Sequence, residues 1–158
     1  MQNLNAFGRA AYVETKKESD ANPFLTIPTI EDEKSVLLLK KSNFCYMMLN
    51  KFPYNAGHLL IMPFREVNRL DLLSAEERTD IIEMVTLGQV ILQKALAPDG
   101  FNIGFNLGAA AGAGIPQHLH CHVVPRWIGD TNFMTILGET RIINQSPEEM
   151  WSRLKKFI

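Results

Sequence analysis

Three histidines stand at every second position in the stretch "QHLHCHVV", at His118, His120 and His122. This alternation predicts a β-strand, because side chains at i, i+2 and i+4 point to the same face of a strand. The imidazoles then line one face, while the intervening Leu119 and Cys121 turn toward a hydrophobic core. Neighbouring histidines would lie about 7 Å apart, a spacing that suits several contacts with one phosphate or one metal ion.

The flanking sequence predicts further strands. Two short apolar runs separated by a polar turn at 40–43 indicate a β-hairpin, and "HLLIMPF" indicates a third strand that ends near Pro63. "FNIGFNL", at 101–107, alternates like a fourth strand. With the histidine stretch, about five antiparallel strands are expected.

Two helices are predicted from their start signals. Ser74 and Glu77 form the pattern of a capping box, and the apolar residues that follow at helical spacing predict one long helix over one face of the sheet. Ser146 and Pro147 predict the start of a C-terminal helix at 146–158. The fold class is therefore α+β.

The domain organisation is predicted to be simple. A chain of 158 residues is long enough to bury one core, and no linker or repeat divides it. Residues 1–30 are mixed in character and contain prolines, which indicates an N-terminal arm. We expect one domain over 1–158, with its core at 36–140.

The composition restricts partners and location. Sixteen Lys plus Arg against seventeen Asp plus Glu give a net charge of -1, which argues against nucleic acid as a partner. No apolar run approaches the roughly 18 residues of a membrane span, and the N-terminus lacks a secretory pattern. We expect a cytoplasmic protein without membrane contact, whose Cys45 and Cys121, both within apolar runs, are buried thiols.

Two chemical uses of the histidine row are open at this point. A neutral imidazole can attack phosphorus when its other nitrogen keeps the proton, and the loop at 104–114 holds four glycines and four alanines whose amides can approach an anion. Alternatively, two imidazoles bind zinc together with the third or with His58. Asp130 is the one acidic residue within ten positions of the row, so carboxylate support for a metal would come from elsewhere.

The segment 118–124 resembles the His-φ-His-φ-His-φ-φ signature of the histidine-triad (HIT) family. "LNKFPYNAGHLLIMPFREV" is similar to the family's upstream segment with its Gly-His pair, and "NLGAAAGAG" to its Asn-x-Gly loop. The run after the row is most similar to the bacterial branch associated with diadenosine tetraphosphate phosphorylase or hydrolase activity. The resemblance implies a HIT-like antiparallel sheet that is extended across a homodimer.

The resemblance also implies roles for individual residues. His120 would be the nucleophile that attacks the α-phosphate of a nucleotide, and His122 would contact the non-bridging oxygens. His118 and His58 would pack against each other and orient the row, and the His118 carbonyl would accept the Nδ1 proton of His120. Asn106 would reach the scissile bridge.

Further substrate contacts are implied outside the row. Asn50 matches a position that holds the ribose, and the loop before the row offers Gly112, Gly114 and Gln117. Many relatives place a Ser or Thr near the leaving group, but this loop has none. The contact with the leaving group and the exact substrate therefore stay open.

A second departure concerns metal. Many bacterial relatives carry a zinc-binding Cys-x-x-Cys near the N-terminus, but "NPFL" places Asn22 and Leu25 at the thiol positions. We expect no resident metal and no cofactor beyond Mg²⁺ carried on the substrate phosphates. Arg126 and Trp127 stay outside the predicted catalytic set.

The sequence therefore predicts a nucleotidyl hydrolase or transferase that cleaves the α-phosphate linkage of dinucleoside polyphosphates or nucleoside phosphoramidates. The acceptor, water or inorganic phosphate, stays open. Two alternatives also stay open: a nucleotide-binding sensor with little turnover, and a metal-binding protein built on the histidine cluster.

Overall fold

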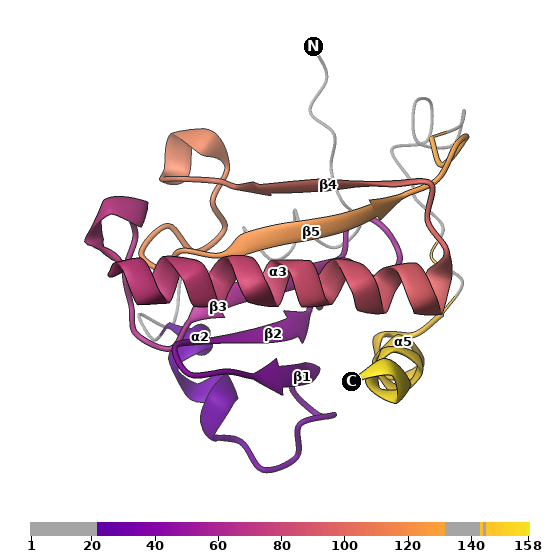
Figure 1. The fold of residues 1–158 in the computed structure, drawn as a ribbon, viewed down its shortest axis with the longest axis horizontal. Helices are drawn as coiled ribbons and strands as arrows, with labels where there is room; N and C mark the ends of the chain where they lie inside the picture. Colours follow the sequence, from indigo (N-terminus) through magenta and orange to yellow (C-terminus); the bar gives the residue numbers. More distant parts are fainter. Residues whose placement is uncertain (1–21, 132–142, 144) are drawn as a thin grey trace.

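The computed structural model describes residues 22–131, 143 and 145–158. Within these residues five strands form one antiparallel sheet in the order β1-β2-β3-β5-β4 (Figure 1). The strands are β1 (Leu38–Lys41), β2 (Cys45–Leu49), β3 (Leu59–Pro63), β4 (Gly100–Phe105) and β5 (Cys121–Arg126). The predicted antiparallel sheet of about five strands is confirmed.

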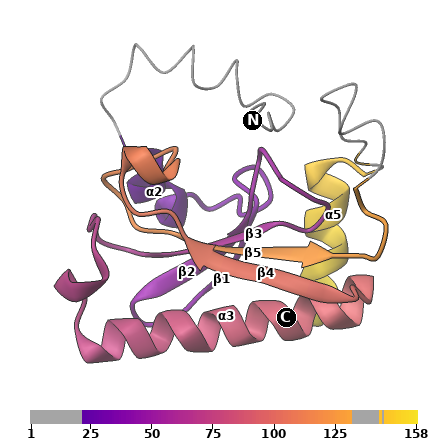
Figure 2. The ribbon, with the colours of Figure 1, turned by 90° about the horizontal axis from the view of Figure 1, so that it is seen from above.

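The long helix α3 (Ala75–Leu96) covers one face of the sheet, and the short helix α2 (Pro23–Thr26) lies on the opposite side (Figure 2). The predicted capping box of α3 is present: Ser74 Oγ accepts from the Glu77 amide at 3.2 Å, and the Glu77 carboxylate accepts from the Ser74 amide at 2.7 Å. These two bonds satisfy amides that a helix start leaves without intrahelical partners. The start of α3 is thus fixed by local sequence.

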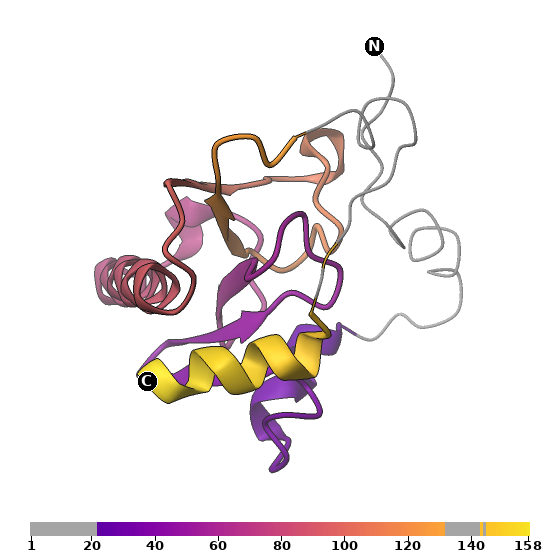
Figure 3. The same cartoon turned by 90° about the vertical axis from the view of Figure 1, so that its right-hand side faces the viewer.

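The predicted C-terminal helix is α5 (Pro147–Leu154), which continues into the 3-10 turn η4 (Lys155–Phe157). It begins with a second capping box, formed by Ser146 and Glu149. Figure 3 shows α3 end-on and α5 lying across the edge of the sheet near β1. The Trp151 indole N–H donates to the Leu38 carbonyl at 2.7 Å, which ties α5 to β1.

The described part of the expected N-terminal arm contains two helical turns. Asn22 is the N-cap of α2, its side chain accepts from the Phe24 amide, and Pro23 follows at the first helical position. The 3-10 turn η1 (Ile27–Thr29) continues the chain. Residues 1–21 lie outside the described part of the chain.

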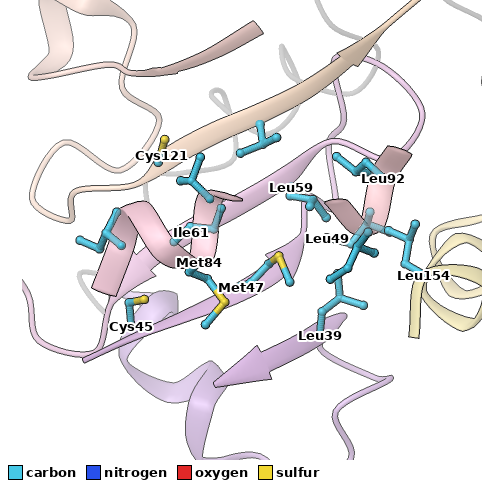
Figure 4. Close-up of a cluster of buried hydrophobic side chains, with 14 of the residues drawn as sticks. Leu39, Cys45, Met47, Leu49, Leu59, Ile61, Met84, Leu92, Cys121 and Leu154 are labelled. Carbon is cyan, nitrogen blue, oxygen red and sulfur yellow. The ribbon is translucent and has the colours of Figure 1, made fainter. Parts of the chain in front are cut away.

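The sheet is buried on both faces, because apolar side chains alternate between two clusters. Cys45, Met47 and Leu49 of β2 point toward α3, while Tyr46 and Met48 point toward α2. Figure 4 shows the α3 side, where side chains of β1, β2, β3 and β5 meet those of the helix. Burying each large aliphatic side chain contributes about 1.5–3 kcal/mol, so this layer holds the sheet that carries the histidines.

The histidine stretch keeps its predicted faces but not its predicted strand boundaries. Leu119 and Cys121 lie in the α3-side core as expected. The strand, however, begins only at Cys121, which pairs with Ile61 of β3. Before this point the Leu119 amide donates to the Val67 carbonyl instead, at 2.6 Å. The ladder therefore stops because the loop after β3 takes over the hydrogen bond.

Among the described residues, no helix combines the length and apolarity that a bilayer crossing requires. The two cysteines are buried free thiols, as predicted. Burial raises the pKa of Cys121 to about 11 and that of Cys45 to about 12, so both stay protonated near neutral pH.

Candidate active site

The structure brings the four histidines together on the sheet face opposite α3. His118 and His120 precede β5, His122 lies in it, and His58 directly precedes β3. His58 and His118 are almost completely buried, and His120 is only 6% exposed. The rings of His120 and His122 lie 5.0 Å apart. The row is thus a packed constellation rather than a set of surface side chains.

The proton of His120 is held by backbone. Its Nδ1 lies 2.8 Å from the His118 carbonyl oxygen, which is the contact that the family resemblance implied. A carbonyl oxygen only accepts, so Nδ1 must carry the proton. In the neutral ring the lone pair is then on Nε2.

The opposite tautomer is imposed on His122 through His58. The Tyr54 amide donates to His58 Nδ1 at 3.1 Å, and the Asn50 side-chain amide lies 3.2 Å from the same nitrogen. With two donors at Nδ1, the proton of His58 lies on Nε2, which is 2.9 Å from His122 Nδ1. His122 therefore accepts at Nδ1 and keeps its proton on Nε2.

This arrangement corrects one expectation. His58 was expected to pack against His118, but its ring lies 5.1 Å from that of His122 and bonds to it. His118 has other neighbours. The reason is the register of β3 against β5. Leu60 of β3 pairs with His122, so His58, which directly precedes β3, lies beside His122 and not beside His118.

His118 is fixed at both ring nitrogens. Its Nε2 lies 2.9 Å from the Pro63 carbonyl oxygen, and its Nδ1 lies 2.8 Å from the Asn22 side-chain nitrogen. The carbonyl requires a proton on Nε2, and the amide N–H requires a lone pair on Nδ1. Burial lowers the pKa of His118, which keeps this ring neutral.

Two aromatic residues that the sequence analysis did not single out frame the row. The Tyr54 ring stacks on His122 with an interplanar angle of 22°, and its centroid lies 4.6 Å from that of His58. Phe24 of α2 meets His118 and His120 edge-on, with both centroid distances at 5.5 Å. An aromatic inside the "KFPYNAG" turn was the available signal for Tyr54, whereas no local pattern pointed to Phe24.

Both predicted amide side chains, Asn50 and Asn106, lie beside the histidines, but their contacts differ. Asn106 follows β4, and its Nδ2 lies 3.5 Å from His122 Nε2; both nitrogens carry protons in the tautomer assigned above, so this is a close approach and not a hydrogen bond. Asn50 bonds to His58, and its oxygen accepts from the Phe52 amide at 2.9 Å. Asn50 therefore helps to set the His58 tautomer, and its contact with a ribose stays a prediction.

The glycine-rich loop uses several of its amides internally. It contains the 3-10 turn η3 (Ala109–Ala111), and Gly112 adopts a φ of 85°, in the region that favours glycine. The Gly112 amide donates to Ala109 and the Ala113 amide to Gly108. These bonds fold the loop beside the row, while substrate contacts at Gly112, Gly114 and Gln117 stay predictions.

Arg126 is part of a clamp rather than of the row. Its guanidinium bonds to both oxygens of Asp130, at 2.6 and 2.7 Å, and this pairing lowers the pKa of Asp130. Asp130 also accepts from the Asn55 side chain at 2.9 Å, and Asn55 bonds to the Pro125 carbonyl. The clamp ties the turn that carries Tyr54 and His58 to the end of β5.

Hydrogen bonds to protein groups occupy several of the histidine nitrogens, and this disfavours the metal-binding alternative. His58 and His122 face each other through one hydrogen bond, and both nitrogens of His118 are bonded to protein groups. Across the described ranges, no three His, Cys, Asp or Glu side chains are grouped as a metal site requires. The hydrogen bonds favour instead a pair of neighbouring imidazoles, His120 with a lone pair on Nε2 and His122 with a proton on Nε2.

Comparison with known proteins identifies the family. The sequence profile of the HIT domain matches residues 31–127, and the chain belongs to the HIT family. An AP-4-A phosphorylase from Mycobacterium tuberculosis is 41% identical over 127 residues, which are 80% of this chain and 65% of that protein. An asymmetrical bis(5'-nucleosyl)-tetraphosphatase from Schizosaccharomyces pombe is 37% identical over 78 residues, 49% of this chain and 42% of that protein. The chain thus spans less than two thirds of either relative.

Solved structures show the same fold. A hypothetical histidine triad nucleotide-binding protein from Sulfolobus tokodaii superposes with a TM-score of 0.68 at 20% identity, over 86% of this chain and 91% of that one. A zinc-bound histidine triad family protein from Mycobacterium smegmatis gives 0.63 at 25% identity, over 77% and 82%. The HIT-like architecture expected from the sequence is therefore confirmed.

Proposed function

We propose that this chain is a HIT-type nucleotidyl hydrolase or transferase that cleaves the α-phosphate linkage of dinucleoside polyphosphates through an adduct on His120. The observation that carries the proposal is the set of hydrogen-bond partners of the two rings, which assigns a lone pair to Nε2 of His120 and a proton to Nε2 of His122. The names of the relatives, a phosphorylase of AP-4-A and a bis(5'-nucleosyl)-tetraphosphatase, support this substrate class.

In the first step the Nε2 lone pair of His120 attacks the α-phosphorus. An N–P bond forms, the bridging P–O bond breaks, and the remaining polyphosphate leaves with the electron pair of that bond. The Nδ1 proton stays on His120, where the His118 carbonyl stabilises the positive charge that develops on the ring. Diadenosine tetraphosphate would yield an adenylyl-histidine and ATP.

Negative charge on the phosphoryl oxygens would be stabilised by His122. Its Nε2–H is a donor prepared before the substrate arrives, because Tyr54 and Asn50 fix the tautomer of His58. A preorganised donor of this kind contributes about 3–4 kcal/mol to transition-state stabilisation. We propose that Asn106, whose side-chain nitrogen lies 3.5 Å from the same nitrogen, contacts the scissile bridge.

In the second step an acceptor attacks the same phosphorus and His120 leaves. Water would release AMP and inorganic phosphate would release ADP, so the products identify the acceptor. Neither step in this proposal uses a resident metal; Mg²⁺ would enter with the substrate phosphates.

Intact-protein mass spectrometry after mixing with diadenosine tetraphosphate tests the proposal. We expect an adduct of one adenylyl group on the wild type and none on His120→Gly. Glu83→Gln, which changes an exposed side chain of α3 on the other side of the sheet, is the control and should form the adduct. An adduct on His120→Gly would refute the role of His120. Binding of the nucleotide without adduct or products would favour the sensor alternative.

We also propose that two copies pair through β4, which extends the sheet. In the described structure β4 is the last strand on one side of the sheet, and Ile103 on it is 47% exposed. An uncovered strand edge presents backbone groups to a second strand. Light scattering should give twice the chain mass, and Ile103→Lys should shift the protein toward the monomer. A wild-type monomer at micromolar concentration would refute this pairing.

A further inference from the structure

We propose that Asn22 is a positioning residue for the histidine row: its side-chain amide holds His118 in one place and one tautomer. This inference rests on the proposed function only where it concerns reaction rate. Asn22 lies outside residues 31–127, the segment that matches the HIT domain. The site would then depend on a residue that the domain match does not include.

Each polar group of the Asn22 side chain has a hydrogen-bond partner in the structure. The side chain is buried, and its nitrogen lies 2.8 Å from His118 Nδ1 and 2.6 Å from the Glu66 carboxylate. Its oxygen accepts from the Phe24 amide at 3.1 Å. An asparagine side chain has two N–H donors and one carbonyl acceptor, so these three contacts use each group once.

The orientation of the amide is determined by these partners. The Phe24 amide only donates and the Glu66 carboxylate only accepts, so the oxygen must face Phe24 and the nitrogen must face Glu66. The second N–H then points at His118 Nδ1, which must offer a lone pair. Glu66 thus fixes Asn22, and Asn22 in turn fixes His118.

The consequence for the nucleophile follows through the backbone of His118. Its ring is held between Asn22 and the Pro63 carbonyl, and its own carbonyl holds the Nδ1 proton of His120 at 2.8 Å. A movement of His118 therefore changes the contact that selects the reactive tautomer of His120. Asn22 acts on the reaction through His118 and need not touch the substrate.

The position of α2 itself does not depend on this contact alone. The Tyr46 hydroxyl donates to the Phe24 carbonyl at 2.7 Å, and Phe24 packs in the α2-side core. Substitutions that keep the helix cap should consequently leave the segment in place. Asp and Ser are as good as Asn at an N-cap, so both preserve the bond to Phe24 while removing the amide donor.

Asn22→Asp is the first test variant, because it keeps size and cap but replaces the donor with an acceptor. Glu66→Gln is the matched control, since its side-chain oxygen still accepts from Asn22. The charged and titratable groups that face His118 are Glu66 and His120. In Asn22→Asp the new carboxylate would draw a proton onto Nδ1 of His118.

Two-bond ¹H–¹⁵N correlation spectra of the histidine rings give a readout that does not depend on activity. We expect His118 to carry its proton on Nε2 in the wild type and in Glu66→Gln, and to gain a proton on Nδ1 in Asn22→Asp. A wild-type ring protonated on Nδ1 instead, or an unchanged ring in Asn22→Asp, would overturn the inference.

The rate of adduct formation in single turnovers gives the functional readout. We expect a fall of about tenfold to a hundredfold in Asn22→Asp with little change in KM, similar to the loss when an outer partner of a metal-bound imidazole is removed. An unchanged rate would overturn the functional half of the inference. If the wild type forms no adduct, the proposed function fails, while a change in the His118 tautomer would still support the positioning role.

Asn22→Ser provides a second variant should Asn22→Asp not fold. Its hydroxyl caps α2 but is too short to replace the amide at His118. The Pro63 carbonyl still holds the proton on His118 Nε2 in this variant, but Nδ1 loses its donor, so we expect the ¹⁵N shift of Nδ1 to move. An unchanged Nδ1 shift would overturn the inference.

Discussion

Gly57, the residue directly before His58, provides a quantitative test of how the site is attached to the core. Its φ is +78°, and a Cβ at this position would lie 2.6 Å from Leu96 Cδ1 and 3.0 Å from Leu92 Cδ2. The left-handed conformation costs a non-glycine residue about 1–2 kcal/mol, and the overlap with α3 adds about 1–3 kcal/mol. Restriction of the unfolded chain returns about 0.4–1 kcal/mol. For Gly57→Ala we therefore expect a net loss of about 2–4 kcal/mol.

Gly129→Ala separates the two costs. Gly129 has nearly the same φ, +79°, but a Cβ there would meet no atom within 4 Å. It should lose only about 0.5–1.5 kcal/mol, the conformational cost less the gain from the unfolded chain. Urea unfolding followed by circular dichroism measures both, with an unchanged m-value as the sign of an intact two-state transition. Equal losses in the two variants would refute the claim that the turn before His58 packs against α3.

Three further changes test other contacts of the structure. Arg65 lowers the pKa of Glu77 from 4.5 to about 2, so this pair stabilises the fold above pH 4.5 and the contribution is lost as the pH falls toward 2. The difference in urea midpoint between wild type and Arg65→Ala should shrink over that interval, and a constant difference would contradict the pairing. Asp130 accepts from Arg126, from the Asn55 side chain and from the Trp127 amide, so Asp130→Asn would place an amide donor against these donors. We expect the free energy of unfolding to fall by about 1–3 kcal/mol. An unchanged urea midpoint would show that the clamp does not form in solution. Leu154→Ala, at a fully buried position of α5, should cost about 2–5 kcal/mol in the same assay, whereas a loss under 1 kcal/mol would indicate that α5 is not docked.

Features set by neighbouring residues were predictable from the sequence. The capping boxes at Ser74 and Ser146 depend on residues three positions apart, and the alternation around Cys121 assigns each side chain to a face. The start of β5 was not predictable, because it depends on the Leu119 amide bonding to Val67, more than fifty positions earlier in the chain. The extent of a strand is set by its partner as well as by its own pattern.

In the candidate site, too, contacts between residues far apart in the sequence were not predictable. The contact between His120 and the His118 carbonyl was implied by the family resemblance and is present, whereas the partner of His58 implied by the same resemblance was wrong. That partner lies 64 positions away, and the register of β3 against β5 selects it. Asn22 was noted only for the thiol that it replaces, since no local pattern indicates that it bonds to a residue 96 positions away. The cytoplasmic location and the lack of a resident cofactor stay predictions.

The repetition that makes the histidine row recognisable also leaves it ambiguous. Sliding the segment by two residues would still present imidazoles to the same side of the sheet, so the row itself does not determine which ring occupies the central place. The observed alignment is held at its ends, where the Leu119 amide bonds to Val67 and the Asp99 amide bonds to Arg126. Both anchors are backbone bonds without a side-chain signature. We therefore expect that a substitution which disturbs either backbone bond changes which imidazole occupies the central position, although no histidine is altered.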